Sequence, residues 1–213
     1  MQIIKLVLGD YENNCYIVRT ENSANCLIID TGLDTSPLLE CLKNYNLTPL
    51  ALVLTHGHGD HIAGVELLRK DYPNIKIYIH KADAEMLTSA VKNCSALVGR
   101  NISISPADVV IEKEGTTDFE GFKFDVLHTP GHTPGGICLY NSENKIIFTG
   151  DTLFAKSVGR TDFPGYDTQA RMQQLIENIH KKLLVLPDDT NVLPGHGPAS
   201  TILKEKKYNP YLH

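Results

Sequence analysis

The stretch LTHGHGDHIAG, residues 54–64, places three histidines and one aspartate within six positions and sets glycines between them. It follows the apolar run LALVLT at 50–55, which predicts a strand, and it precedes a helical pattern at 62–72. Gly57 and Gly59 have no side chain, so they allow the backbone to curl between the two elements. The stretch therefore requires a fold in which a strand ends in a tight polar turn and a helix begins at once.

The four polar side chains of this turn have the types and the spacing of metal ligands. Residues i and i+2 of an extended segment point the same way, so His56 and His58 can bind one ion. Asp60 and His61 fall where the helix begins and can face a second ion. A polar turn with surface histidines is the alternative, but an HxHxDH pattern is rare by chance and favours a metal site.

The composition describes a chain that can bury a substantial core. Of its 213 residues, 42% are hydrophobic and 21% are charged, and the length fits one domain over 1–213. The net charge of −5 argues against a nucleic-acid-binding face, and the basic run at 204–207 is expected to be a solvated helix face. No apolar run reaches the roughly 18 residues of a membrane span, and the N-terminus lacks a signal-peptide pattern. We therefore expect a cytoplasmic protein whose five cysteines are reduced and mostly buried.

Apolar and β-branched periodicity predicts a fold of mixed strands and helices. The expected strands are 3–8, 15–20, 26–30, 50–55, 75–79, 122–127, 137–140, 145–150 and 191–194. The expected helices are 34–45, 62–72, 81–92 and 167–184, the last with Asp167 as its N-cap. Consecutive strands followed by mixed strands and helices indicate an α/β or α+β chain.

Polar residues come directly after several of these strands, where loops gather at one edge of a sheet and sites are usually built. A catalytic zinc takes about three protein ligands and a water, so the four ligands of the HxHxDH turn cannot complete two sites. The candidates for the remaining positions each follow a strand, and they are His132, Asp151 and His196.

Four segments, in this order and at these intervals, resemble the metallo-β-lactamase fold superfamily: THGHGDHIAG, TPGHTPGG, GDTLFAKSVGRTDFPG and LPGHGP. The GRTDFPG and LPGHGP segments narrow the resemblance to the glyoxalase II (hydroxyacylglutathione hydrolase) branch in its single-domain bacterial form. The resemblance covers almost the whole chain, including the tail EKKYNPYL. It implies an αββα sandwich of two mixed β-sheets flanked by helices, with metals at one edge.

Position by position, the resemblance implies two metal sites that share one aspartate. The ligands would be His56, His58 and His132 for the first ion, Asp60, His61 and His196 for the second, and Asp151 for both. The ions would be two divalent metals, zinc first, with iron or manganese also compatible. They would lower the pKa of a shared water, and the resulting hydroxide would attack a thioester carbonyl, with Asp60 and Asp151 as the catalytic residues beside it. The implied activity is hydrolysis of small acyl thioesters similar to S-lactoylglutathione.

The resemblance assigns two further residues. Asp30, in IIDTG, resembles a family position that supports the ligand loops, and Arg160, in VGRTDF, resembles a basic residue that contacts glutathione. The helical C-terminal domain of two-domain glyoxalase II enzymes is not expected, because the chain ends soon after LPGHGP. The remaining histidines are assigned no direct role, His128 being expected to hydrogen-bond within its own loop; they are His80, His128, His180 and His213.

A persulfide dioxygenase is the alternative within this fold, with one iron held by two histidines and one aspartate. His196 suits a second metal and favours the hydrolase. A secreted β-lactamase, an RNA-processing nuclease and a flavodiiron protein fit less well, because the expected signal peptide, basic arm and flavodoxin-like domain are not seen. A non-enzymatic metal-binding protein is a third class. The expected partner is a small-molecule thioester, with no nucleic acid and no membrane, and the oligomeric state is left open.

Overall fold

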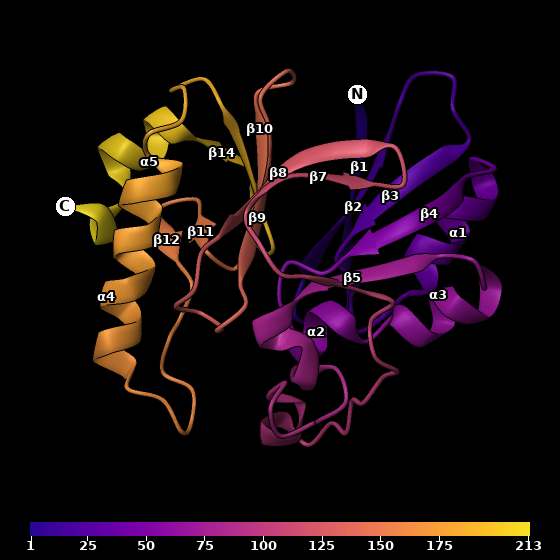
Figure 1. The fold of residues 1–213 in the computed structure, drawn as a ribbon, viewed down its shortest axis with the longest axis horizontal. Coiled ribbons are helices and arrows are strands. Elements are labelled where there is room, and N and C mark those ends of the chain that lie inside the picture. The colour runs from indigo at the N-terminus through magenta and orange to yellow at the C-terminus, as the bar shows by residue number, and fades with distance from the viewer. The chain divides into compact units, whose positions relative to one another are not determined.

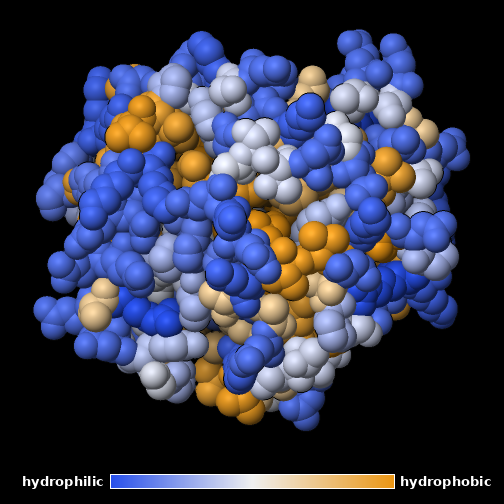
Figure 2. Space-filling model, in the orientation of Figure 1, coloured by the Kyte–Doolittle hydropathy of each residue, from blue (hydrophilic) through white to orange (hydrophobic).

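The computed structural model describes residues 1–213, which divide into two compact units. Unit 1 comprises residues 1–112 and 118–122, and unit 2 comprises residues 113–117 and 123–213. The chain forms two six-stranded sheets and one small two-stranded sheet (Figure 1). No helix is long and apolar enough to cross a membrane. The face drawn in Figure 2 carries mostly hydrophilic residues, with apolar side chains in groups among them.

The first sheet belongs to unit 1. Its strands are β1 (Gln2–Leu8), β2 (Asn13–Arg19), β3 (Asn25–Ile29), β4 (Thr48–Val53), β5 (Lys76–His80) and β6 (Val109–Ile111). They lie in sequence order across the sheet; β1 to β3 pair antiparallel, and β3 to β6 pair in parallel. The loops after β3, β4 and β5 therefore leave from the same edge. Asp30 follows β3, His56 follows β4, and His80 ends β5.

The helices of unit 1 pack on this sheet. They are α1 (Ser36–Asn44), α2 (Gly59–Ile62), α3 (Val65–Asp71) and the 3-10 helices η1 (Lys81–Met86) and η2 (Ser95–Val98). Leu42 of α1 and Leu68 of α3 are fully buried in one core with Ile28 and Leu52 of the central strands. This packing fixes the sheet edge that carries the histidine-rich turn.

The second sheet has the order β14-β13-β10-β9-β8-β7. Its strands are β7 (Gly115–Phe119), β8 (Phe122–His128), β9 (Ile137–Asn141), β10 (Ile146–Gly150), β13 (Asn191–Pro194) and β14 (Ser200–Thr201). Because β9 is antiparallel to both β8 and β10, and β10 is parallel to β13, three strands run in one direction. Their following loops leave from one edge and carry His132, Asp151 and His196.

The helices of unit 2 cover one side of its sheet (Figure 1). They are α4 (Thr168–Asn178), its π-helical continuation η3 (Ile179–Leu183), α5 (Ile202–Tyr208) and the 3-10 helix η4 (Pro210–Leu212). Asp167 caps α4 as predicted, since its carboxylate accepts the Ala170 N–H at 3.0 Å. Leu175 and Ile179 are buried with Val192 of β13. A small hairpin, β11 (Leu153–Phe154) with β12 (Ser157–Val158), follows β10.

The predicted mixed α/β class is confirmed, and each of the predicted strands corresponds to an observed strand. The strands β6, β7, β11, β12 and β14 were not predicted, and of α5 only a helix face at 204–207 was expected. In the basic run at 204–207, Lys204 and Lys207 are exposed as expected, whereas Glu205 is fully buried. Strands β6, β11, β12 and β14 have only two or three residues, which give too little periodicity to detect from sequence. The five residues of β7, GTTDF, include only one apolar side chain.

Two predicted helices differ from the structure. The helix expected at 62–72 is divided at Gly64, whose N–H is hydrogen-bonded to Thr31 Oγ1 at 3.0 Å. A Cβ on Gly64 would lie 2.5 Å from Thr35 Oγ1, so this close packing takes precedence over a continuous helix. The α-helix expected at 81–92 is wrong: a 3-10 helix ends at Met86 and turns follow it. Asp83 in that segment turns inward to the histidine loop, so tertiary contacts outweigh helix propensity there.

Candidate metal centre

The histidine-rich turn follows β4 and is held by the segment after β5. The Gly57 N–H donates to the buried carboxylate of Asp83 at 3.0 Å, and the Gly59 N–H donates to the Asn93 carbonyl at 2.9 Å. A Cβ on Gly57 would lie 2.6 Å from Met86 Cβ. Neither glycine has a positive φ, so the expectation that they supply curl is wrong. They are needed because another part of the chain approaches the backbone too closely for a side chain.

The histidines of this turn are buried together. His56, His58 and His61 are 1%, 7% and 0% exposed, which excludes the alternative of surface histidines. The ring of His56 lies 4.9 Å from that of His58 and 4.1 Å from that of His61, measured between centroids. As expected, Asp60 lies in the first turn of a helix, in α2, and His61 follows it there. Burying three imidazole rings is costly unless their nitrogens are hydrogen-bonded or bind a metal.

Asp30 orients two of these histidines, His61 directly and His56 through Thr55. Its Oδ1 accepts the Thr55 N–H at 2.7 Å, and its Oδ2 accepts the Thr55 hydroxyl at 2.7 Å. The same Oδ2 lies 3.0 Å from His61 Nδ1. Asp30 is 1% exposed and has a φ of 56°, a left-handed conformation that Asp tolerates better than most residues. Asp30 thus contacts the segment that follows β4 at two residues, Thr55 and His61.

These hydrogen bonds fix the tautomers of His56 and His61. A carboxylate can only accept, so His61 carries its proton on Nδ1 and its lone pair on Nε2. The single hydroxyl hydrogen of Thr55 is donated to Asp30, so Thr55 Oγ1 accepts from His56 Nδ1 at 3.1 Å. His56 therefore also has its lone pair on Nε2. Thr55 joins Asp30 to His56, and sequence reasoning missed it although it directly precedes the HxHxDH motif.

Asp60 is held by a residue of strand β2. Asn13, a fully buried residue at the start of β2, donates from Nδ2 to Asp60 Oδ2 at 3.2 Å. Asp60 Oδ2 also lies 3.7 Å from His61 Nε2, and its side chain is 18% exposed. Asp60 and His61 thus present an oxygen and a nitrogen donor to the same place, as the spacing predicted.

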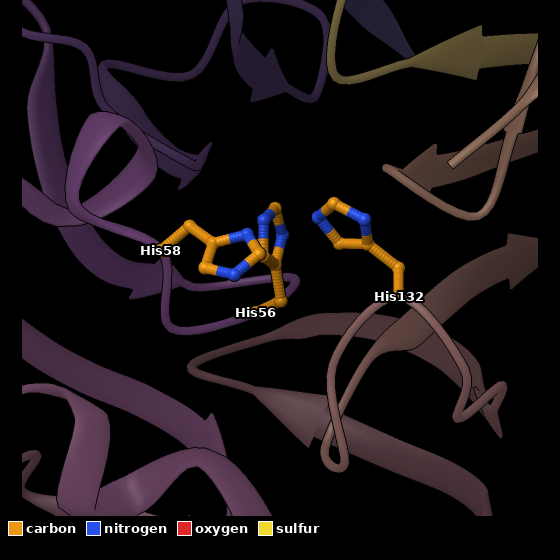
Figure 3. A group of neighbouring side chains, drawn as sticks. All are labelled: His56, His58 and His132. Carbon is orange, nitrogen blue, oxygen red and sulfur yellow. The ribbon is translucent and has the colours of Figure 1, made fainter. Parts of the chain in front are cut away.

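Unit 2 presents a second set of donors. His132 Nε2 lies 3.5 Å from Asp151 Oδ2, and His196 Nε2 lies 3.6 Å from the same oxygen. The side chains of His132, Asp151 and His196 are 6%, 11% and 27% exposed. The structure therefore brings together the three strand-end residues that the sequence predicted. Figure 3 draws His132, from the loop after β8, with His56 and His58, from the loop after β4.

The donor set fits divalent metal ions. Two donors about 2.0–2.1 Å from one tetrahedral ion stand about 3.3 Å apart, close to the separations seen around Asp151 Oδ2. His132 Nδ1 lies 2.8 Å from the Arg160 carbonyl, which can only accept, so its lone pair also lies on Nε2. A ligand histidine whose other nitrogen donates to a carbonyl or carboxylate is typical of metal sites.

Aromatic rings flank two of these histidines. Phe163 packs edge-to-face on His132, with ring centroids 5.3 Å apart, and Phe154 packs on His196 at 6.2 Å. The Arg160 guanidinium lies 5.1 Å above the Phe163 ring and is paired with Asp162 at 2.7 Å. The Arg160 side chain is 65% exposed, so it stays a candidate for contact with substrate. The contacts of its carbonyl, and both phenylalanines, were not predicted.

The other histidines and the cysteines were predicted to have no direct role in the site. His128 Nε2 donates to the Pro134 carbonyl at 2.9 Å within its own loop, His80 is buried at the end of β5, and His180 is exposed on η3. Burial raises the pKa of the Cys26 thiol to about 12 and that of Cys138 to about 11. These thiols are protonated at neutral pH and are not nucleophiles.

Strand-end loops that carry buried histidines and aspartates define a metal-dependent enzyme of the metallo-hydrolase class. The profile of the Metallo-beta-lactamase superfamily matches residues 8–196, and the chain belongs to this superfamily. It is 35% identical over 210 residues to the probable metallo-hydrolase YqgX of Bacillus subtilis, covering 98% of this chain and 96% of the relative. It is 36% identical over 215 residues to hydroxyacylglutathione hydrolase GloC of Haemophilus influenzae, covering 100% and 99%.

Solved structures agree with this assignment. The crystal structure of BLEG-1 B3 metallo-beta-lactamase matches with a TM-score of 0.92 and 38% identity, over 99% of each chain. The crystal structure of TTHA1623 in a di-iron-bound form matches with a TM-score of 0.82 and 36% identity, over 98% of this chain and 100% of that one. The predicted metallo-β-lactamase fold is thereby confirmed.

Proposed function

We propose that this protein is a glyoxalase II-like hydrolase of small acyl thioesters that works with two divalent metal ions. The observation that carries the proposal is the set of buried histidines whose Nδ1 atoms donate to fixed acceptors and whose lone pairs lie on Nε2. Such imidazoles are prepared as metal ligands. Zinc is the first candidate metal. Iron is the second, because the chain is similar to a protein whose crystal structure is in a di-iron-bound form.

We assign the ligands as the family resemblance implies. His56, His58 and His132 would hold one ion; Asp60, His61 and His196 would hold the other; and Asp151 would bridge them. The first two groups, His56 with His58 and His132, and Asp60 with His61 and His196, each combine residue types that can hold a metal ion. Asp151 belongs to a third such group with His56 and His61.

Two bound divalent cations would supply an activated water at neutral pH and would polarise a carbonyl oxygen. The chain's own residues provide orientation. Asp60 is held by Asn13 and can hydrogen-bond the attacking water, and Asp151 Oδ2 is shared between His132 and His196. The Arg160 guanidinium can exchange its contact with Asp162 for a carboxylate of the substrate, because both groups are exposed.

The similarity to GloC supports an acyl thioester of the hydroxyacylglutathione type as substrate. We further propose that the protein acts on a small molecule in the cytoplasm, which agrees with the buried thiols Cys15, Cys26, Cys41 and Cys138.

Hydrolysis of a β-lactam is a second candidate activity. The observation that favours it is the similarity to BLEG-1, whose name identifies it as a B3 metallo-beta-lactamase. A lactam and a thioester both present a carbonyl carbon to a water nucleophile, so one metal centre can serve either. The groups around the substrate, such as Arg160 and Phe163, would decide between them.

The test is a comparison of substrates on protein of known metal content. Purified protein is loaded with zinc or iron, its metal is counted per chain, and hydrolysis of S-lactoylglutathione, a simple acyl thioester and a cephalosporin is measured. We expect two ions per chain and a higher kcat/KM for the thioesters than for the cephalosporin. His58→Ala should lower thioester kcat/KM by more than about 100-fold, the upper range for an outer-shell partner of a metal.

His180→Ala is the matched control, because it removes an exposed histidine from η3 and should leave metal content and rate unchanged. Cephalosporin hydrolysis faster than every thioester would replace the first proposal with the second. One iron per chain, with oxygen uptake on glutathione persulfide, would establish the dioxygenase alternative. Full thioester activity in His58→Ala would contradict a metal-dependent mechanism.

A further inference from the structure

The segment from Asp151 to Arg160 contains one candidate metal ligand of unit 2 and contacts the other two, His132 and His196. Asp151 begins it, the ring of Phe154 packs on His196 at 6.2 Å, and the Arg160 carbonyl accepts from His132 Nδ1 at 2.8 Å. The Gly159 N–H donates to the Thr152 carbonyl at 3.3 Å and closes the segment on itself. Within it lies the hairpin of β11 and β12. The position of this one segment therefore determines how three donors face each other.

The two ends of the segment are packed too tightly to move independently. A Cβ added to Gly159 would lie 1.9 Å from the Asp151 carbonyl oxygen and 3.1 Å from His132 Cβ. No side chain other than hydrogen fits there. A displacement of the hairpin is consequently transmitted to both Asp151 and His132.

The opposite end of the hairpin is held by the C-terminal tail. The Lys156 N–H, at a residue with a φ of 62°, donates to Glu205 Oε2 at 2.8 Å. Asn209 Nδ2 donates to the Ser157 carbonyl at 3.0 Å and to Glu205 Oε2 at 2.8 Å. The Ser200 hydroxyl donates to Glu205 Oε1. Figure 1 shows β11 and β12 beside the C-terminal helices.

Glu205 and Asn209 are both fully buried. A carboxyl group buried in this way would be costly, but three donors satisfy it, and none of them is a cationic side chain. Hydrogen bonds of this kind have defined directions, whereas apolar packing would tolerate sliding. The network thus specifies where the hairpin sits. Glu205 and Asn209 belong to the tail EKKYNPYL, which has no other role in the proposed reaction.

We infer that Glu205 and Asn209 are positioning residues for the metal-binding half-site of unit 2, acting through the β11–β12 hairpin. The inference rests on the proposed metal function. Loss of the network frees the hairpin, and the distances from Asp151 Oδ2 to His132 Nε2 and His196 Nε2 are then no longer fixed.

The decisive variants differ in what they leave in place of the carboxylate. Glu205→Leu keeps a branched side chain of similar size but removes every acceptor. Glu205→Gln keeps an oxygen for Lys156 and Asn209 and turns its amide toward Ser200, whose hydroxyl can accept instead of donate. Leu183→Ala, in the apolar core of unit 2 with Leu175 and Val192, is the control for a loss of stability that leaves the network intact.

Three quantities are measured on the full chain: the affinity for zinc by chelator competition, the visible spectrum of the cobalt-loaded protein, and hydrogen exchange of peptide 151–160 in the metal-free protein. We expect Glu205→Leu to bind zinc 10- to 100-fold more weakly, as for an outer-shell partner, with an altered cobalt spectrum and faster exchange. Glu205→Gln should restore all three. Leu183→Ala should lower the thermal midpoint without changing affinity or spectrum.

Wild-type affinity and spectrum in Glu205→Leu would overturn the inference while the proposed function stands. Weaker binding in Leu183→Ala to the same degree would also overturn it, since the effect would then be one of stability alone. Where Glu205→Leu does not fold, the same measurements on Asn209→Ala decide the question. A wild-type protein that retains neither zinc nor cobalt would refute the proposed function, and this inference with it.

Discussion

Unit 1 and unit 2 each bring ligand-type side chains to one edge of a sheet, but they orient them by different means. In unit 1 the donors are neighbours in sequence, and the carboxylate of Asp30 sets two imidazoles, one directly and one through Thr55. In unit 2 the donors come from three loops, and a backbone carbonyl sets His132. Orientation by a side chain can be removed by one substitution. Orientation by the backbone is lost only when the backbone moves.

The largest effect is expected from Asp30→Ala. Removal of this buried carboxylate leaves the Thr55 N–H, the Thr55 hydroxyl and His61 Nδ1 without their acceptor. We expect the free energy of unfolding of the metal-free protein to fall by about 3 kcal/mol or more, because each buried donor left without an acceptor costs about 1–3 kcal/mol. Chemical denaturation of the wild type and the variant measures the difference.

Asp30→Asn separates stability from ligand orientation in the same place. Asn tolerates the left-handed φ of 56° and keeps one acceptor oxygen, but its amide can only donate toward His61 Nδ1. It should regain much of the stability while still binding metal more weakly than the wild type. Equal metal affinity in Asp30→Asn and the wild type would show that the tautomer of His61 is not set by this carboxylate.

The contrast between the units also explains what could be predicted from sequence. His56, His58, Asp60 and His61 were found because the four lie within one motif, and the β3 to β5 edge follows from the strand pattern. His132, Asp151 and His196 were found because each follows a strand that points to the same edge. Their assignment to particular metal ions came only from the family resemblance.

The parts that sequence reasoning missed depend on tertiary contacts without a local pattern. Thr55 is one of many threonines until its hydroxyl is seen between Asp30 and His56. Glu205 looks like a member of a charged helix face, because its neighbours are lysines, and only the structure buries it. The need for glycine at Gly57 arises from the approach of Met86, which no spacing reveals.

A second comparison uses one glycine from each unit. In Gly159→Ala the new Cβ meets the Asp151 carbonyl oxygen at 1.9 Å, and backbone must move. In Gly57→Ala it meets the Met86 side chain, with Cβ at 2.6 Å and Sδ at 3.0 Å. We expect thermal or chemical denaturation to show a loss of about 3 kcal/mol for Gly159→Ala and of about 1–2 kcal/mol for Gly57→Ala, within the range for overpacking. A larger loss for Gly57→Ala than for Gly159→Ala would contradict the argument that a backbone contact in unit 2 tolerates less change than a side-chain contact in unit 1.

The smallest effect concerns one carboxylate of unit 2 at low pH. Burial alone would raise the pKa of Glu114, but the Lys182 ammonium at 2.6 Å and the His128 N–H at 2.7 Å outweigh it and hold this pKa below 4.5. A carboxylate whose folded pKa lies below its unfolded pKa adds stability above the unfolded pKa, and that stability is lost as the pH falls through the folded pKa.

Glu114→Gln should therefore lower the urea midpoint of the metal-free protein slightly at pH 7, and the difference from the wild type should shrink as the pH falls below 4.5. A difference that stays constant down to pH 3 would mean that Glu114 acts through packing and not through its charge. Lys182 also donates to the His128 carbonyl at 2.6 Å. That result would therefore mean that this hydrogen bond, and not the ion pair with Glu114, holds the end of β8.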